Sequence, residues 1–245
     1  MRADLFLSKN NHAKSRSAAA ELIKSGVEIN GVKIEKPSQN VPDGFETYDV
    51  KISEPQKYVS RGGIKLEAAL DKFRVSPKGL VCADIGASTG GFTDCLLSHG
   101  AEKVYAIDVG HGQLDDKIQN DGRVVSMEGV NARTLTAAMI GRRVPLVVMD
   151  VSFISQALIY GAVYDVLEAG GTLISLIKPQ FEAGPENVGK GGIVKDAAVR
   201  REIVKHLKDE AKKNGLNMRA VMESPITGGD GNVEYLALFK KIGRS

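Results

Sequence analysis

The feature that most constrains the fold of this chain is an alternation between short apolar runs and helical patterns, which begins at residue 64. The first helical pattern places apolar residues at the i, i+3, i+4 and i+7 positions from Leu66 to Phe73. Apolar runs of strand length follow at 80–85, 103–108, 124–127, 146–150, 172–177, 218–222 and 234–239. Strands that alternate with helices assemble into a sheet with helices on both faces. The sequence therefore predicts an α/β domain with a seven-stranded, doubly wound sheet.

The first sixty residues have a different pattern. A helical stretch ends at Gly26, and two alternating strands over 27–34 are joined by Asn30-Gly31, the pair that best adopts the positive φ angles of a tight hairpin. A further strand is expected at 48–53. Residues 54–63 lack periodicity and contain one proline and two glycines. We therefore predict a small α+β domain with its linker over 1–60 and a larger domain over 61–245.

The formal net charge of +3 is concentrated in the small domain. Residues 2–36 hold seven basic and four acidic side chains, so this segment accounts for the whole excess of positive charge. Basic side chains on a helix and beside a hairpin can contact phosphate oxygens, although a solvated charged face is the alternative. The candidates for RNA contact are Arg2, Lys9, Lys14, Arg16, Lys24 and Lys33.

The order of features in this segment carries a resemblance. R-x-D-x-x-L followed by AKSRSAAAELIKSGVEINGVKIEKPSQNV resembles the small RNA-binding module first recognised in a small-subunit ribosomal protein. The resemblance spans residues 2 to about 45 and implies a structured RNA as the partner. The module also occurs in pseudouridine synthases and tyrosyl-tRNA synthetases, so it does not specify a reaction.

A glycine-rich turn follows the first strand of the larger domain, with small residues before the next helix. A nicotinamide-binding turn needs glycine where Ser88 stands, which argues against that cofactor. A serine esterase is a second alternative, since residues 86–90 read G-x-S-x-G and Asp150 and His206 follow in the appropriate order. Against the esterase, the turn follows the first strand, and His206 is predicted to lie inside a helix.

The third interpretation is a site for S-adenosylmethionine. Small residues let backbone amides approach the amino-acid end of that cofactor, and its carboxylate suits a helix N-terminus. Asp108 ends the next strand, where a carboxylate can accept hydrogen bonds from both ribose hydroxyls. Asn131 follows the third strand and could bind the adenine amino edge, or it could simply form a turn. The predicted cofactor residues are Gly86, Ala87, Ser88, Thr89, Gly90, Gly91, Phe92, Asp108, Asn131 and Asp150.

Four polar residues are expected to meet at the carboxyl edge of the sheet: Lys65, Asp150, Lys178 and Glu234. SRGGIKLEAAL, GASTGGFTD, AIDVG, MDVSF, LIKPQFEAG and GGDGNVEYLAL resemble the hemolysin A or TlyA-type branch of the FtsJ-like RNA methyltransferases over essentially the whole chain. The resemblance implies a Rossmann-like class I methyltransferase fold and S-adenosylmethionine as methyl donor. It also implies a ribosomal RNA substrate, generally a cytidine 2′-hydroxyl, and a catalytic role for these four residues.

That chemistry requires the removal of a proton from a weakly acidic alcohol while the methyl group is displaced in line. We expect Lys178 to be the general base, with Lys65 favouring its neutral form through like-charge repulsion. Asp150 and Glu234 would position the two lysines and the cofactor. A structural network of salt bridges is the alternative for these residues, and no metal is required.

Two further expectations concern partners and compartment. A non-catalytic factor that binds ribosomal RNA or helps ribosome assembly could use the small domain alone, whereas the cofactor turn and the four polar residues favour an enzyme. The longest apolar runs are shorter than a membrane-spanning helix, and charges interrupt the N-terminus where a signal peptide would be apolar. A cytoplasmic protein without membrane partners is expected. Cys82 and Cys95 lack the spacing of a zinc site and are expected to be buried thiols.

Overall fold

The structure is a computed structural model that describes residues 1–42, 47–52 and 57–243. Contacts divide the chain into two compact units, Met1–Lys57 and Tyr58–Ser245. The division falls three residues before the boundary expected from the sequence. Residues 53–56, where the linker and the end of the third small-domain strand were expected, lie outside the described residues.

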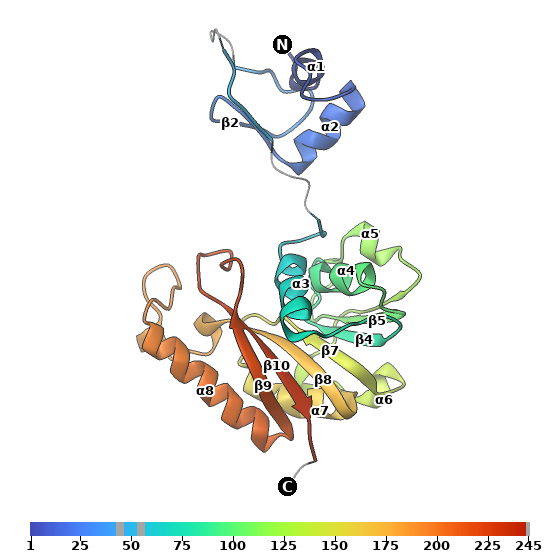
Figure 1. Ribbon diagram of the computed structural model, residues 1–245, viewed down its shortest axis with the longest axis vertical. Helices are drawn as coiled ribbons and strands as arrows, with labels where there is room; N and C mark the ends of the chain where they lie inside the picture. The colour runs from blue at the N-terminus through green and yellow to red at the C-terminus, as the bar shows by residue number, and fades with distance from the viewer. Residues whose placement is uncertain (43–46, 53–56, 244–245) are drawn as a thin grey trace. The chain divides into compact units, whose positions relative to one another are not determined.

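The first unit combines two helices with a small antiparallel sheet (Figure 1). Its elements are α1 (Ala3–Lys9), α2 (Arg16–Ser25), β1 (Val27–Ile29), β2 (Val32–Ile34) and β3 (Val50–Ile52), with strand order β2-β1-β3. The predicted hairpin is confirmed, since Asn30 and Gly31 have φ angles of 48° and 77°. The sequence analysis did not predict α1, which buries Phe6 and Leu7 in the core of this unit.

The second unit has the predicted seven-stranded sheet, with order β6-β5-β4-β7-β8-β10-β9. Its strands are β4 (Val81–Ile85), β5 (Lys103–Ile107), β6 (Val124–Met127), β7 (Val144–Met149), β8 (Leu167–Ile177), β9 (Leu216–Glu223) and β10 (Tyr235–Lys241). Strands β4 to β8 pair in parallel, and β10 is antiparallel to both of its neighbours. Strand β8 starts at Leu167, before its predicted residue 172, because Leu167 already pairs with Val144 of β7; the register then shifts, and regular pairing resumes at Thr172.

Helices cover both faces of this sheet, as a doubly wound fold requires (Figure 1). One face is packed by α3 (Gly62–Phe73) and α4 (Gly91–Ser98), and the other by α7 (Tyr160–Val166) and α8 (Ala197–Lys213). Two short helices, α5 (Asp116–Gln119) and α6 (Ala137–Ile140), and short 3-10 turns complete the unit. The predicted α/β fold class is thereby confirmed.

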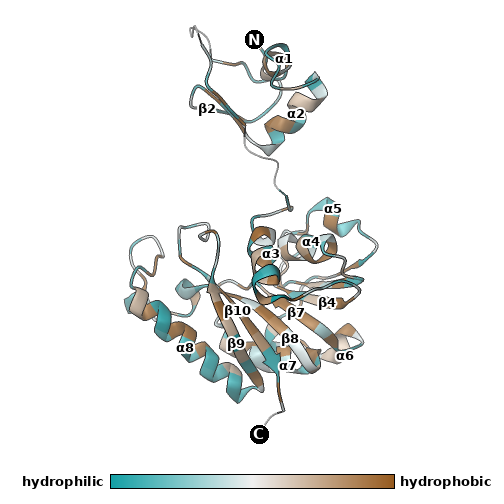
Figure 2. Cartoon of the chain, viewed as in Figure 1, coloured by the Kyte–Doolittle hydropathy of each residue, from teal (hydrophilic) through white to brown (hydrophobic). Residues whose placement is uncertain are grey.

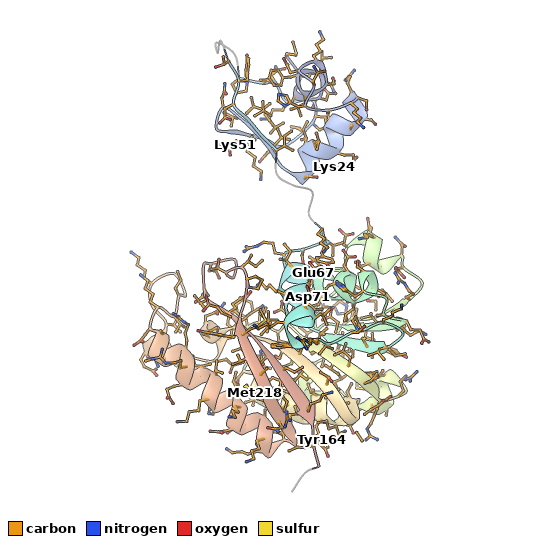
Figure 3. The ribbon with its side chains drawn as sticks, viewed as in Figure 1. Lys24, Lys51, Glu67, Asp71, Tyr164 and Met218 are labelled. Atoms are coloured by element: carbon orange, nitrogen blue, oxygen red, sulfur yellow. The ribbon has the colours of Figure 1, made fainter. Side chains whose placement is uncertain are left out.

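The core of the second unit consists of two apolar clusters, one on each face of its seven-stranded sheet. Figure 2 shows α8 with alternating hydrophobic and hydrophilic patches, which agrees with the burial of Ile203, Leu207 and Ala211 against the sheet. Tyr164 and Met218, both labelled in Figure 3, pack at the edge of this cluster as partly buried side chains. Among the described residues, no helix has both the length and the apolar character needed to cross a membrane.

Candidate active site

The glycine-rich turn joins β4 to α4 at the carboxyl edge of the sheet. Gly86 has a φ of 84°, and a Cβ atom there would lie 2.2 Å from the backbone oxygen of Asp150. At Gly91 a Cβ atom would lie 2.0 Å from the Ser60 hydroxyl, which can rotate, and 3.2 Å from the backbone nitrogen of Gly63. Glycine is therefore required at Gly86, and the turn brings segments from distant parts of the sequence against its backbone.

Asp108 anchors the loop that follows β5 to this turn. Its Oδ2 accepts a hydrogen bond of 2.8 Å from the backbone N–H of Ser88, and its Oδ1 accepts one of 2.8 Å from that of Gly110. A carboxylate has about four lone-pair positions, so each oxygen retains capacity for a further donor. Asp108 therefore fixes the turn while remaining able to accept from the hydroxyls of a ribose.

A cavity of about 550 Å³ opens beside Asp108. Among the predicted cofactor residues, Gly86, Ser88, Asp108, Asn131 and Asp150 line it. The rest of the lining was not predicted from the sequence. It comes from the end of β5 and from the segments that follow β5, β6 and β7: Ile107, Val109, Gln113, Val130, Ala132, Arg133, Val151, Ser152, Phe153, Ile154 and Ile159. Position after the carboxyl end of a parallel strand was the signal available for these residues.

Asn131 has a local role that the sequence left open. Its side-chain oxygen accepts a hydrogen bond of 3.0 Å from the backbone N–H of Arg133 and caps a short 3-10 turn, Ala132–Thr134. That oxygen is the atom that would accept from an adenine amino group. The turn alternative is therefore observed, and a contact between Asn131 and adenine stays a prediction.

A second, smaller cavity of about 170 Å³ adjoins the same turn. Ala87, Thr89, Gly91 and Phe92, all predicted cofactor residues, line it together with Gly86, Ser88 and Asp150. Lys65 and Lys178 also reach this cavity, as do three residues not predicted from the sequence: Ser60, Gly62 and Ser152. Gly90 lines neither cavity. It precedes α4 with a φ of 92° and faces Ile118.

The four polar residues expected to meet form two separate lysine–carboxylate pairs. Lys65 Nζ donates to Glu234 Oε2 at 2.5 Å, and the two side chains are 9% and 2% exposed. Lys178 Nζ lies 2.6 Å from Asp150 Oδ1, with 14% and 21% exposure. Each lysine therefore has its own carboxylate partner. The negative charges of Glu234 and Asp150 offset the like-charge repulsion that was expected between Lys65 and Lys178.

A buried polar network connects the loop after β7 to the end of β8. Gln156 is 1% exposed, its Nε2 donates to the backbone oxygen of Leu176, and its Oε1 accepts from the Ser175 hydroxyl. Glu182 accepts from the backbone N–H of Gln156 and from the hydroxyl of Ser155. The network therefore ties the loop that follows Asp150 to the strand end that precedes Lys178.

Asp84 lies beneath the site at the end of β4 and is fully buried. Thr93 donates to its Oδ2 at 2.7 Å, whereas its Oδ1 has no hydrogen-bond partner among the described residues. Burial raises the pKa of Asp84 to about 7, and the negative charge of Asp150 adds to the shift. This carboxyl group therefore changes its charge near neutral pH.

Phe153 stands out at the rim of the larger cavity. It is 90% exposed and has a φ of 63°, which is unusual for a residue with a large side chain. Its ring packs against that of Phe181 at a centroid distance of 4.8 Å. The loops that follow β7 and β8 thus each place an aromatic ring at this edge of the site.

The predicted RNA contacts of the first unit differ in their surroundings. Arg2 and Arg16 both pair with the buried Asp4, at 3.0 and 2.7 Å, and Lys24 pairs with Glu21 at 2.8 Å. Lys24 is labelled at the surface of α2 in Figure 3. Lys9, Lys14 and Lys33 are exposed and form no ion pair with another described residue.

The esterase alternative lacks support from these positions. Asp150, which would have to orient a histidine, is paired with Lys178 instead. His206 lies within α8, as the sequence predicted, and it interacts electrostatically with Glu182 and Glu210. Ser88 contributes its backbone N–H to Asp108, which is a structural role.

Similarity to known proteins agrees with the geometry. The chain matches the FtsJ-like methyltransferase family over residues 58–241 and the S4 domain family over residues 1–44. It is 44% identical to the protein named Hemolysin A from Brachyspira hyodysenteriae, over 98% of this chain and 99% of that relative. It is 45% identical to the protein named 16S/23S rRNA (cytidine-2′-O)-methyltransferase TlyA from Mycobacterium tuberculosis (strain CDC 1551 / Oshkosh), over 96% of this chain and 87% of that relative.

A solved structure of a protein named as a hemolysin from Streptococcus thermophilus is 38% identical, with a TM-score of 0.76 over 99% of this chain and 88% of that chain. The match extends through both the S4 segment and the sheet domain. The resemblance found in the sequence is confirmed, and with it the methyltransferase activity and its cofactor. The chain belongs to the FtsJ-like methyltransferase family, it carries an S4 domain at its N-terminal end, and S-adenosylmethionine is its methyl donor.

Proposed function

We propose that this enzyme methylates ribose 2′-hydroxyls of ribosomal RNA, with cytidine as the target nucleotide. The observation that carries the proposal is the small cavity, which Lys65 and Lys178 both line, together with residues of the glycine-rich turn. The Mycobacterium tuberculosis relative matches 96% of this chain and is named as an rRNA (cytidine-2′-O)-methyltransferase. Its name supports the choice of ribosomal RNA and of cytidine.

The residues present fit the cofactor. The larger cavity is bounded by a turn that only glycine can form at Gly86, and Asp108 presents acceptors for a ribose at its wall. The Gly86–Gly91 turn would receive the amino-acid end at the start of α4. S-adenosylmethionine supplies a methyl group that its sulfonium centre already activates.

The chain itself then has to position the ribose and remove one proton. In the proposed step, Lys178 enters as a neutral amine and takes the proton of the 2′-hydroxyl while the O–CH₃ bond forms and the S–CH₃ bond breaks. Lys178 becomes an ammonium ion that pairs with Asp150, and the thioether leaves without a net charge. Lys65, held by Glu234, would orient the ribose and stabilise the negative charge that develops on its oxygen.

The proposed division of labour assigns RNA affinity to the S4 unit and chemistry to the sheet domain. Residues 1–60 would bring Lys9, Lys14 and Lys33 to phosphate oxygens, and residues 61–245 would hold the cofactor and the target nucleotide. The exposed ring of Phe153 offers a surface on which a nucleobase can stack. A ribosomal substrate would place the enzyme in the cytoplasm, with ribosomal subunits as partners.

The test is to map 2′-O-methylated nucleotides in 16S and 23S rRNA from a strain that lacks this gene. We expect one or a few cytidines to lose the modification, and to regain it when the purified enzyme and S-adenosylmethionine are added to the isolated subunits. If the same cytidines remain methylated without the gene, the proposed substrate is wrong. If the purified enzyme binds the subunits and transfers no methyl group, the non-catalytic ribosome factor is the correct alternative.

A further inference from the structure

Ser152 contacts the amine of Lys178 from the loop that follows β7. Lys178 Nζ donates a hydrogen bond of 2.9 Å to Ser152 Oγ. Its other close contact, to Asp150 Oδ1 at 2.6 Å, is an ion pair that lacks the geometry of a hydrogen bond. Among the described residues, Ser152 is therefore the only hydrogen-bond partner of this amine.

The two contacts respond differently when the lysine loses its proton. The attraction to Asp150 depends on the charge of the ammonium group, so it weakens greatly in the neutral amine. The contact with Ser152 needs only an N–H donor, and a neutral amine still has two. The hydroxyl of serine can rotate and accept this hydrogen bond in either state.

The fold keeps Ser152 at this position. The same loop is anchored three and four residues later, where Ser155 and Gln156 bind Glu182, and the Gln156 side chain also binds the end of β8. Lys178 follows β8 directly. Ser152 and Lys178 are thus carried by two segments that one buried network ties together.

We infer that Ser152 is a positioning residue that keeps the amine of Lys178 aimed into the small cavity after the lysine has lost its proton. The inference rests on the proposed role of Lys178 as the base. Ser152 lines both the small cavity and the cofactor cavity, so it stands where the ribose and the methyl donor would meet. Two charged groups lie close to this amine: Asp150, on the loop of Ser152, and Lys65, which lines the same small cavity and is paired with Glu234. Asp84 interacts electrostatically with Asp150 and Asp108.

Ser152→Ala and Ser152→Thr form a matched pair for the test. Threonine keeps the hydroxyl, and the exposed position of Ser152 leaves room for its methyl group. Single-turnover methylation of ribosomal subunits from the deletion strain is measured across pH, with saturating RNA and S-adenosylmethionine. We expect Ser152→Ala to slow the reaction by roughly 3- to 10-fold, the range expected for the loss of one hydrogen bond, and Ser152→Thr to restore the rate. Because Ser152 also lines the cofactor cavity, the affinity of each variant for S-adenosylmethionine is measured by calorimetry, and the rates are compared at saturating cofactor.

A double-mutant cycle with Lys178→Ala separates this inference from the proposed function. If Ser152 acts through the lysine, Ser152→Ala has no further effect when Lys178 is already absent. If Lys178→Ala alone keeps the wild-type rate and pH profile, the base assignment fails and the inference fails with it. Two results would overturn only the role of Ser152 when Lys178→Ala is slow. In the first, Ser152→Ala has the wild-type rate. In the second, Ser152→Ala slows the Lys178→Ala enzyme by the same factor as it slows the wild type.

Discussion

Lys65 and Glu234 lie 169 positions apart in the sequence, yet their side chains meet at 2.5 Å and are almost completely buried. Lys65 comes from α3 on one face of the sheet, and Glu234 directly precedes β10. The backbone of Gly228 packs closely against Glu234, since a Cβ atom at Gly228 would lie 2.6 Å from the Glu234 carboxylate. The pair is therefore both part of the candidate active site and a contact that joins the last strand to the first helix of the domain.

Removing one member of this pair should destabilise the fold. Glu234→Ala leaves a buried ammonium group without its partner, and such losses typically cost about 3–5 kcal/mol of unfolding free energy. Chemical denaturation of the full chain measures the change. Glu210→Ala is the matched control, because it breaks the solvent-screened Lys213 pair on α8 and should cost far less stability. Equal losses in the two variants would show that the buried pair contributes no special stability.

Lys178→Ala should slow methyl transfer by about 10²- to 10⁴-fold in single turnover, the usual contribution of a general base. The wild-type rate should rise with pH until the lysine is mostly neutral, and this rise should disappear in the variant. Binding of S-adenosylmethionine and RNA should change little, because the lost group acts on the proton. A variant with the wild-type rate and pH profile would restrict the four polar residues to positioning.

Asp108→Ala should weaken binding of S-adenosylmethionine through two effects. The ribose loses its acceptor, and the backbone N–H groups of Ser88 and Gly110 lose the carboxylate that holds the turn. Asp108→Asn keeps one acceptor oxygen and should fall between the alanine variant and the wild type. Isothermal titration calorimetry gives the three affinities. The same affinity in all three proteins would exclude Asp108 from the cofactor site.

Asp84 should make stability depend on pH. Its pKa is raised from 3.8 to about 7 in the folded protein, so the folded state binds the proton more tightly than the unfolded state. The stability that this proton contributes is complete below about pH 4 and is lost as pH rises through about 7. At about 1.4 kcal/mol per pKa unit, the loss amounts to a few kcal/mol.

Asp84→Asn should remove this dependence, since an amide does not titrate in this range but can still accept from Thr93. The stability difference between Asp84→Asn and the wild type should therefore grow in favour of the variant between pH 4 and pH 8, measured by urea denaturation. Thr93→Val removes the hydroxyl that lowers the pKa of Asp84 and should extend the slope to higher pH. A difference that stays constant across this range would contradict the assignment.

Lys24→Ala and Lys33→Ala should each weaken RNA binding and reduce its salt dependence. Every phosphate contact that is lost should lower the slope of log K against log salt by about 0.7–0.9. Arg16→Ala should weaken binding too, but it also breaks the pair with buried Asp4, so it tests folding and binding together. Lys213→Ala on α8 makes the same change in charge and should leave the slope unchanged. Slopes equal to that of the wild type in both lysine variants would remove Lys24 and Lys33 from the proposed RNA interface.

The sequence by itself determined the local structure of this protein. Apolar runs located all seven strands of the large sheet to within a few residues, because strands that are buried on both faces read as nearly continuous apolar segments. Asn30-Gly31 and Gly86 were recognisable because their backbone angles suit few other residues. Asp150 and Lys178 were expected close together because each follows a strand of the sheet, and the structure pairs them. The sequence analysis missed α1, which is only seven residues long and owes its place to packing.

Only the tertiary structure decided which side chains touch. Strand order brings Glu234 to Lys65 and leaves Lys178 to Asp150 and Ser152, and no local pattern encodes that choice. The same holds for Arg16, whose guanidinium group is engaged by Asp4, and for Asp84, whose raised pKa comes from complete burial. Propensity and periodicity act over a few residues, whereas these pairings and desolvation effects arise between segments that meet only when the sheet and its helices pack.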